Sequence, residues 1–210
     1  MKKNILITGT SRGLGKYLVD NLKYNYEIIG ISRAKIKENN FENICLDLTN
    51  FYDFDKILLK IGEKRVNTII FNAGVGYFGK FEDASDFDYK NIINLNLLSP
   101  ILLLQKVLPY LEEKANIIFI GSIAGKKFMK SAAVYQASKF AIRGFAGALK
   151  NELKGKKVFL INPKILETDF HKDSLVFIPN EKSKITSLEN VLEIIENILE
   201  KKENRFEIDL

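Results

Sequence analysis

Apolar positions along the chain follow two periods. Short, almost continuous apolar runs of strand length are separated by longer segments whose apolar residues recur at helical spacing. Continuous apolar runs are typical of parallel strands that are covered on both faces. The predicted strands are residues 4–9, 26–32, 43–46, 67–74, 116–122, 157–163 and a last short one at 205–210. The predicted helices are residues 13–24, 50–63, 85–113, 132–154 and 187–202.

This alternation of strands and helices predicts an α/β fold. We expect a single Rossmann-like, doubly wound domain over residues 1–210, with a mostly parallel sheet of six to seven strands and helices on both faces. A length of 210 residues with 46% hydrophobic content is enough for one domain with a large core and short for two.

Charge and composition exclude several classes of partner. The net charge is +6, but the lysines are scattered and no basic tract is interleaved with aromatic residues, so no nucleic-acid partner is expected. The first apolar run is broken at Thr8 and Gly9, too early for a signal peptide. No segment approaches the roughly 18 to 20 apolar residues of a membrane span, so no membrane association is expected. The single cysteine, Cys45, excludes an internal disulfide, is expected in the core and fits a cytoplasmic location.

The segment TGTSRGLG, residues 8–15, lies between the first predicted strand and the first predicted helix. Glycines in such a turn allow the backbone to approach a pyrophosphate, whose charge the N–H groups at the helix N-terminus stabilise. Any tight turn between a strand and a helix also favours glycine, and the spacing G-x-x-x-G-x-G is not the commoner one, so its place after a strand is what favours a nucleotide. The residues expected to contact the cofactor here are Gly9, Thr10, Ser11, Arg12, Gly13, Leu14 and Gly15.

The end of the second predicted strand bears on the choice between NADP and NAD. An acidic residue there would bond a ribose 2′-hydroxyl and repel a 2′-phosphate. The chain instead has Ser32 and Arg33, and Arg12 in the glycine turn adds a second cation, so NADP is favoured over NAD. The alternative is that both arginines are ordinary surface charges. Asp47 is placed to meet an adenine edge, although it can equally begin the next helix, as can Thr49.

Tyr135 and Lys139 stand one helical turn apart and suggest a catalytic pair, but their spacing alone does not single them out. In a chain with 8 tyrosines and many lysines, about one Tyr-x-x-x-Lys is expected by chance. The chain contains two further pairs, Tyr52/Lys56 and Tyr110/Lys114. A second criterion is needed to separate the three.

Seven segments, in order, resemble the short-chain dehydrogenase/reductase family over nearly the whole chain. They are TGTSRGLG at 8–15, DL at 47–48, NAG at 72–74, NLLSP at 96–100, GSIAG at 121–125, YQASK at 135–139 and INPKILETD at 161–169. In that family the catalytic serine lies 13 residues before the tyrosine, and 135 − 122 = 13 places Ser122 there. Asn39 and Leu97 hold that place in the other two pairs, and neither can serve as the hydroxyl.

The resemblance implies a catalytic set of Tyr135, Lys139, Ser122 and Asn96. Reduction of a carbonyl group needs a proton donor, and a phenol with a pKa of about 10 is a poor one near neutrality. An ammonium about 4 Å away would favour the phenolate by about 4 kcal/mol, which is enough to bring that pKa to about 7. Lys139 would supply this charge and bond the nicotinamide ribose, Ser122 would bond the substrate oxygen, and Asn96 would anchor a water. Asn96 can also be an interior asparagine that bonds backbone groups.

The resemblance further implies cofactor contacts along the rest of the chain. They are expected from Leu48, Asn72, Ala73, Gly74, Tyr135, Lys139, Pro163, Ile165 and Thr168. One departure is Lys164, which follows the proline where the family usually has glycine. His171 is the only histidine and is read as a loop residue at the rim of the cleft, so no metal site is expected.

The resulting hypothesis is an NADP-dependent oxidoreductase that acts on a small-molecule carbonyl or alcohol. A short substrate lid is expected at 169–186, and the family resemblance implies a homodimer or homotetramer with helices near 90–110 and 135–155 at the interface. The alternative is a catalytically silent protein on the same fold that senses NADP, although such a protein needs no acid with a neighbouring cation. The extended sugar-nucleotide epimerase branch is disfavoured by the glycine spacing.

Overall fold

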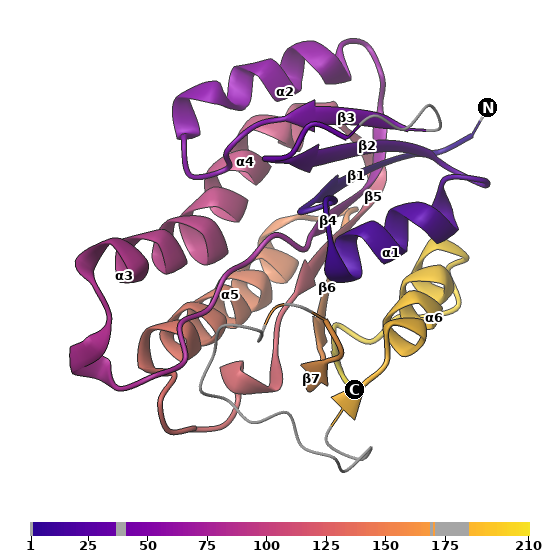
Figure 1. Cartoon of the computed structure of the whole chain (residues 1–210). Helices are drawn as coiled ribbons and strands as arrows, with labels where there is room; N and C mark the ends of the chain where they lie inside the picture. Colours follow the sequence, from indigo (N-terminus) through magenta and orange to yellow (C-terminus); the bar gives the residue numbers. More distant parts are fainter. Residues whose placement is uncertain (1, 37–40, 169, 171–184) are drawn as a thin grey trace.

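The computed structural model describes residues 2–36, 41–168, 170 and 185–210. Seven parallel strands form one sheet in the order β3-β2-β1-β4-β5-β6-β9, which confirms the predicted fold class (Figure 1). The strands are β1 (Asn4–Thr8), β2 (Glu27–Ser32), β3 (Glu42–Cys45), β4 (Val66–Phe71), β5 (Leu111–Ile120), β6 (Lys157–Asn162) and β9 (Glu207–Asp209). The helices are α1 (Gly13–Leu22), α2 (Phe54–Ile61), α3 (Asp86–Ile93), α4 (Ser99–Val107), α5 (Ala133–Glu152) and α6 (Leu188–Leu199).

Helices cover both faces of the sheet (Figure 1). Along β1, the side chains of Ile5 and Ile7 pack in a core with α1 and α6, whereas Leu6 packs in a second core with α2, α4 and α5. This alternation follows from the two-residue period of a strand, and it explains why the strands are apolar on both faces.

The order of the strands creates a crevice at one edge of the sheet. β1 lies between β2 and β4, and the helices α1 and α2 that lead into these two strands cover opposite faces. In open α/β sheets, ligands bind outside the carboxyl ends of the strands at such a reversal. The glycine segment after β1 and the Asn72–Ala73–Gly74 segment after β4 both lie at this place.

The single helix predicted over 85–113 is wrong in two respects. The helical chain contains a π-helical segment, Asn94–Leu98, between α3 and α4, and it ends in a 3-10 turn at Leu108–Tyr110. β5 already begins at Leu111, where its first pairing with β4 is followed by a shift in register. Pro109 ends the α-helix because it lacks a backbone donor.

Three further observations differ from the sequence-based expectations: the exposure of Cys45, a second small sheet, and the apolar character of one helical stretch. Cys45 is exposed on the edge strand β3 rather than in the core. A small two-stranded parallel sheet, β7 (Ile165–Leu166) with β8 (Ile185–Thr186), was not predicted. The helical stretch Asp86–Tyr110 has the length and apolar composition of a membrane span, with 39% of its most apolar window buried, so the expectation that no segment approaches these values is wrong. A helix that covers a sheet passes the same test, and this stretch packs against α2 and α5.

Candidate active site

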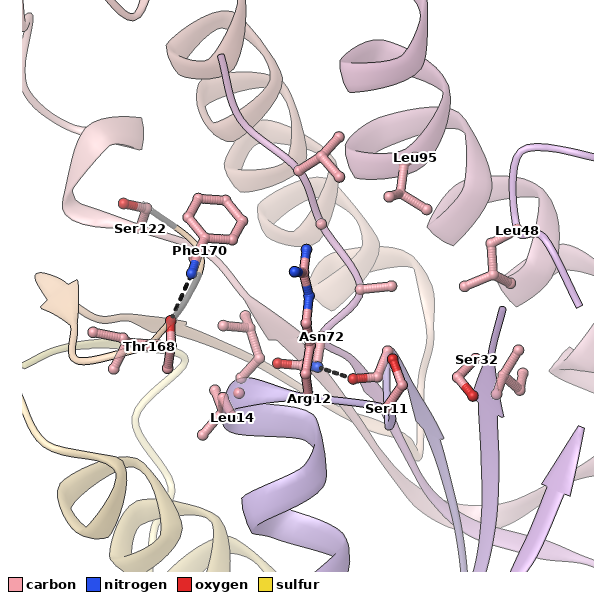
Figure 2. Close-up of a pocket in the computed structure, with 18 of the residues that line it drawn as sticks. Ser11, Arg12, Leu14, Ser32, Leu48, Asn72, Leu95, Ser122, Thr168 and Phe170 are labelled. Atoms are coloured by element: carbon pink, nitrogen blue, oxygen red, sulfur yellow. Dashed lines mark hydrogen bonds between the residues drawn. The ribbon is translucent and has the colours of Figure 1, made fainter. Parts of the chain in front are cut away.

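A cleft lies at the carboxyl ends of the strands and collects most of the predicted site residues. In Figure 2, Ser122, Phe170 and Thr168 lie at one end, Ser32 and Leu48 lie at the other, and Arg12, Leu14 and Asn72 lie between them. The predicted residues that line it are Gly9, Ser11, Arg12, Gly13, Leu14, Ser32, Arg33, Asp47, Leu48, Asn72, Ala73, Gly74, Ser122, Tyr135, Lys139, Pro163 and Thr168. Thr10, Gly15, Asn96 and Ile165 do not line it.

The glycine turn needs its glycines for two different reasons. Gly9 and Gly13 have φ values of 77° and 53°, in the region that favours glycine. Gly15 is needed for space, because a Cβ there would lie 2.6 Å from Nδ2 of Asn72 and would overlap the carbonyl of Gly9. Thr10, one of the predicted contacts that do not line the cleft, is buried and bonds Oδ1 of Asn43 over 3.3 Å.

Asn72 joins this turn to the end of β4. Its side-chain amide donates to the carbonyls of Thr8, at 2.9 Å, and Gly9, at 3.3 Å, while its backbone N–H donates to Oγ1 of Thr8. Helix α1 has no side-chain N-cap and no acidic residue in its first turn. The N–H groups at its start therefore face an open cleft, which fits a pyrophosphate in both shape and charge.

The predicted adenosine end brings two guanidinium groups to the cleft. Arg12 and Arg33 are exposed, line the cleft and form no ion pair with any described residue. Ser32 is buried, and its hydroxyl lies 2.8 Å from the carbonyl of Ala34, so it is already engaged within the protein. Asp47 is exposed and accepts from both the backbone N–H and the hydroxyl of Thr49, which makes it a turn-forming residue that also lines the cleft.

Tyr135, Lys139 and Ser122 meet on the opposite wall. Tyr135 and Lys139 are 7% and 9% exposed, and Nζ of Lys139 lies 5.7 Å from the centre of the Tyr135 ring. Nζ also donates to the carbonyl of Ile120 over 3.0 Å. The Ser122 hydroxyl accepts from the backbone N–H of Ala124 and lies close enough to Tyr135 to lower the pKa of its phenol. The helical spacing thus places both residues on the face of α5 that borders the cleft.

The acidities of this pair differ from the sequence-based expectation. Burial raises the pKa of Tyr135 to about 12, against a smaller lowering by the hydrogen bond with Ser122. Burial also lowers the pKa of Lys139 to about 8. The expected fall of the tyrosine pKa to about 7 is therefore absent, because loss of hydration has the larger effect on both groups.

Asn96 takes the interior role that the sequence left open. It lies in the π-helical segment, is 4% exposed, and exchanges two hydrogen bonds with the backbone of Val75 at 2.8 and 2.9 Å. Its amide also donates to Oγ of Ser138, which precedes Lys139. Both Asn96 and Lys139 border a small second cavity beneath the cleft, so Asn96 connects the wall after β4 with α5.

The segment after β6 closes the predicted nicotinamide end. A Cβ at Gly13 would lie 3.5 Å from the Thr168 side chain, so Thr168 lies against the glycine turn. Leu166, rather than the predicted Ile165, lines the cleft. Lys164, in place of the family glycine, also lines it without a positive φ, so the turn is not strained by the substitution. Most of the predicted lid at 169–186, with His171, lies outside the described residues.

Several further residues line the cleft, beyond the catalytic and cofactor contacts predicted from the sequence. They are Ile31, Leu46, Thr49, Val75, Asn91, Leu95, Ile120, Gly121, Lys164, Leu166 and Phe170. Phe170 and Phe78 pack on the Tyr135 ring, with centroid distances of 5.9 and 5.1 Å. The run of aromatics after Gly76 was a signal for this cluster, although it also suited a core role.

The comparison with protein families gives the identity of this fold and cleft. The model of the short chain dehydrogenases matches residues 3–176, well over half of the chain. The chain belongs to the short-chain dehydrogenase family. It is therefore an oxidoreductase with a binding site for a nicotinamide cofactor.

Curated relatives support this assignment. An uncharacterized oxidoreductase of Saccharomyces cerevisiae is 30% identical over 190 residues, which cover 80% of this chain and 72% of the relative. A 3-ketodihydrosphingosine reductase of Bacteroides thetaiotaomicron is 32% identical over 174 residues, or 79% of this chain and 65% of the relative. The chain thus spans about two thirds of the length of the relatives it matches.

Solved structures share the fold at lower identity. A short chain dehydrogenase family protein from Francisella tularensis has a TM-score of 0.87 at 24% identity and covers 100% of this chain and 97% of its own. A 3-ketoacyl-(acyl-carrier-protein) reductase from Brucella melitensis, complexed with NADH, has a TM-score of 0.88 at 20% identity, covering 99% and 96% of the two chains. A short-chain dehydrogenase from Sphingobium yanoikuyae, in complex with NADPH, has a TM-score of 0.84 at 19% identity, covering 99% and 87%.

Proposed function

We propose that the protein is an NADP-dependent oxidoreductase that reduces a small carbonyl compound, with Tyr135 as the proton donor. The observation that carries this proposal is the grouping of Tyr135, Lys139 and Ser122 on one wall of a cleft whose other parts suit a dinucleotide. A protein that only sensed NADP would need no phenol beside a serine hydroxyl and a buried ammonium.

The chain's own groups divide the work of reduction. When bound, NADPH supplies the hydride. The Ser122 oxygen accepts from Ala124 N–H, which orients its own hydrogen for donation to a carbonyl oxygen in the cleft. Tyr135 then gives its proton to the same oxygen. A pKa near 12 keeps this phenol protonated at neutral pH, which suits the direction that consumes a proton.

Lys139 acts through its charge and its remaining hydrogens. One N–H is engaged by the carbonyl of Ile120, which fixes the ammonium beside the tyrosine ring. The other two are available for ribose hydroxyls and for stabilising the phenolate that forms as the proton leaves. Below pH 8 this lysine is mainly charged. At neutral pH the site therefore combines a charged Lys139 with a protonated Tyr135, which is the form that can donate a proton.

The preference for NADP rests on the two arginines at the other end of the cleft. Two exposed guanidinium groups without an acidic partner among the described residues suit a 2′-phosphate, and the described residues directly after β2, 33–36, include no carboxylate to bond a 2′-hydroxyl. Neighbours of the same fold were solved with either cofactor, so the preference depends on these side chains.

Turnover with NADPH tests the proposed function. The protein is mixed with NADPH and a panel of ketones, aldehydes and quinones, and absorbance of the reduced cofactor is followed. Tyr135→Phe is expected to lower kcat by roughly 10²- to 10⁴-fold, because it removes the acid and little else. Tyr52→Phe, at a tyrosine that is 95% exposed and also precedes a lysine by four, is the matched control. Equal activity of Tyr135→Phe and the wild type would refute Tyr135 as the proton donor.

A further inference from the structure

We propose that Lys164 recognises an anionic group on the substrate, so that the preferred substrates are carbonyl compounds that carry a carboxylate. This inference rests on the proposed function and narrows its substrate class. Lys164 was the one departure from the family pattern in the segment after β6, and neither the fold nor the proposed chemistry accounts for it.

The backbone of Lys164 is fixed beside the proposed reaction centre. The carbonyl of Pro163 accepts from the N–H of Ile123, the residue after Ser122, over 3.1 Å. The N–H of Lys164 donates to Oγ1 of Thr186 in β8 over 3.0 Å. These two bonds anchor the residue at the end of the cleft that holds Ser122, and its four-carbon side chain is long enough to bring an ammonium close to a substrate bound there.

The side chain of Lys164 has no partner among the residues that the structure describes. It is exposed and lines the cleft, and it forms no hydrogen bond or ion pair through its side chain with any described residue. Asp47 is the single carboxylate among the described cleft residues, and it lies at the adenosine end. Lys164 lies near Ser122, and Lys139 adds a second cation at the same end of the cleft, so this end is positive and attracts an anion.

The cofactor phosphates are the competing partner for this charge. The expected pyrophosphate position is over the glycine turn, where Thr168 lies against Gly13. Lys164 precedes Thr168 by four residues, with β7 between them, and its anchoring bonds run toward Ser122 and β8 instead. The position therefore favours the substrate. In the reaction, the carbonyl carbon gains the hydride of NADPH, the oxygen gains the Tyr135 proton, and the carboxylate is unchanged.

The test compares acids with their methyl esters, which lack the negative charge and carry one additional methyl group at the same end. The pairs are short 2-oxo, 3-oxo and 4-oxo acids, such as pyruvate, acetoacetate and levulinate, each against its methyl ester. The ratio of kcat/KM for acid over ester is measured for the wild type, Lys164→Met, Lys164→Gly and Lys164→Arg. For at least one pair, Met and Gly are expected to lower the ratio at least about tenfold, whereas Arg keeps it. Lys127→Met, at an exposed lysine that does not line the cleft, should leave the ratio unchanged.

Two binding measurements distinguish a failure of the inference about Lys164 from a failure of the proposed function. In Tyr135→Phe protein with NADPH, calorimetry should show tighter binding of the acid than of its ester, and Lys164→Met should remove the difference, whether or not turnover occurs. NADPH affinity, measured by fluorescence, should be the same in Lys164→Met and the wild type. Turnover of esters and acids at equal efficiency would overturn the inference but leave the proposed function intact. Weaker NADPH binding in Lys164→Met with an unchanged acid-to-ester ratio would assign Lys164 to the cofactor and also overturn it.

Discussion

Lys139 is a residue whose proposed role in the reaction comes at the expense of stability. The residue is 9% exposed, and burial lowers the pKa of its ammonium from 10.5 to about 8. The folded protein therefore binds the proton of this ammonium less strongly than the unfolded chain does. The spacing of Lys139 from Tyr135 was readable in the sequence, but its burial depends on how α5 packs against β5, which no local pattern gives.

Lys139→Met is expected to raise the free energy of unfolding at pH 7. A shift of this size corresponds to roughly 3 kcal/mol, and loss of the bond to Ile120 offsets roughly 1 kcal/mol of it. The unfolded chain keeps its proton up to about pH 10.5, whereas the folded protein releases it at about pH 8. Wild-type stability therefore rises with pH across this window, and the advantage of the variant shrinks there.

Urea titrations at a series of pH values would measure this difference. Lys114→Met, at the exposed lysine of a rival pair, should change the unfolding free energy by no more than about 0.5 kcal/mol. If the free energy of unfolding of Lys139→Met exceeded that of the wild type by an amount that grew between pH 8 and pH 10.5, the explanation from burial would be contradicted.

Arg33 is the residue on which the cofactor preference can be tested. A charge-assisted bond to the 2′-phosphate is absent with NADH, so Arg33→Ala should reduce the affinity ratio of NADPH over NADH about tenfold. Fluorescence titration with each cofactor gives both affinities. Arg65→Ala removes an arginine that bonds the carbonyl of Pro109, away from the cleft, and should leave the ratio unchanged. A ratio that Arg33→Ala does not alter would leave NADP without its proposed determinant.

At the scale of the elements, the sequence predicted the order and type of nearly every strand and helix. Apolar runs and helical periods depend on local spacing, so they were visible without coordinates. The π-helical segment and the small β7–β8 sheet were not, because they depend on contacts between distant residues. Asn96 illustrates this point, since its bonds to Val75 and Ser138 join parts of the chain 21 and 42 residues away.

The glycine turn is the element whose shape tolerates least change. A Cβ at Gly15 would overlap the carbonyl of Gly9, and neither α1 nor the turn can move without losing the Asn72 bonds. Gly15→Ala is expected to destabilise the protein by about 3 kcal/mol and to weaken NADPH binding. Gly147→Ala, within α5, meets Phe206 at an ordinary 3.8 Å and should be neutral or slightly stabilising. Equal urea midpoints for the two variants would show that the turn can accommodate a Cβ at residue 15 and would contradict the prediction.

At the scale of the whole molecule, one open surface fits the expected homodimer. The exposed small residues Ala133, Ala137, Gly144 and Ala148 share one face of α5, and space beside Gly144 is open within 4 Å. The apolar helical stretch Asp86–Tyr110, of whose most apolar window 39% is buried, packs against the same helix. We propose that these two helices form the subunit interface.

Gly144→Glu tests this interface, because a carboxylate buried there would be unpaired. Light scattering should give a mass of at least twice the 24.0 kDa chain for the wild type and a single-chain mass for the variant. Gln105→Glu, at an exposed position of α4, shows whether negative charge anywhere on these helices has the same effect. A wild-type protein that is a monomer at micromolar concentration would contradict the proposed dimer.

The exposed position of Cys45 has a practical consequence. Its thiol bonds the carbonyl of Arg33 and stands two residues before Asp47, at the rim of the adenosine end. As the chain has one cysteine, a maleimide dye would attach at a single place without any engineering of the protein. The molecule thus carries its own labelling point for following nucleotide occupancy optically, independently of the identity of its substrate.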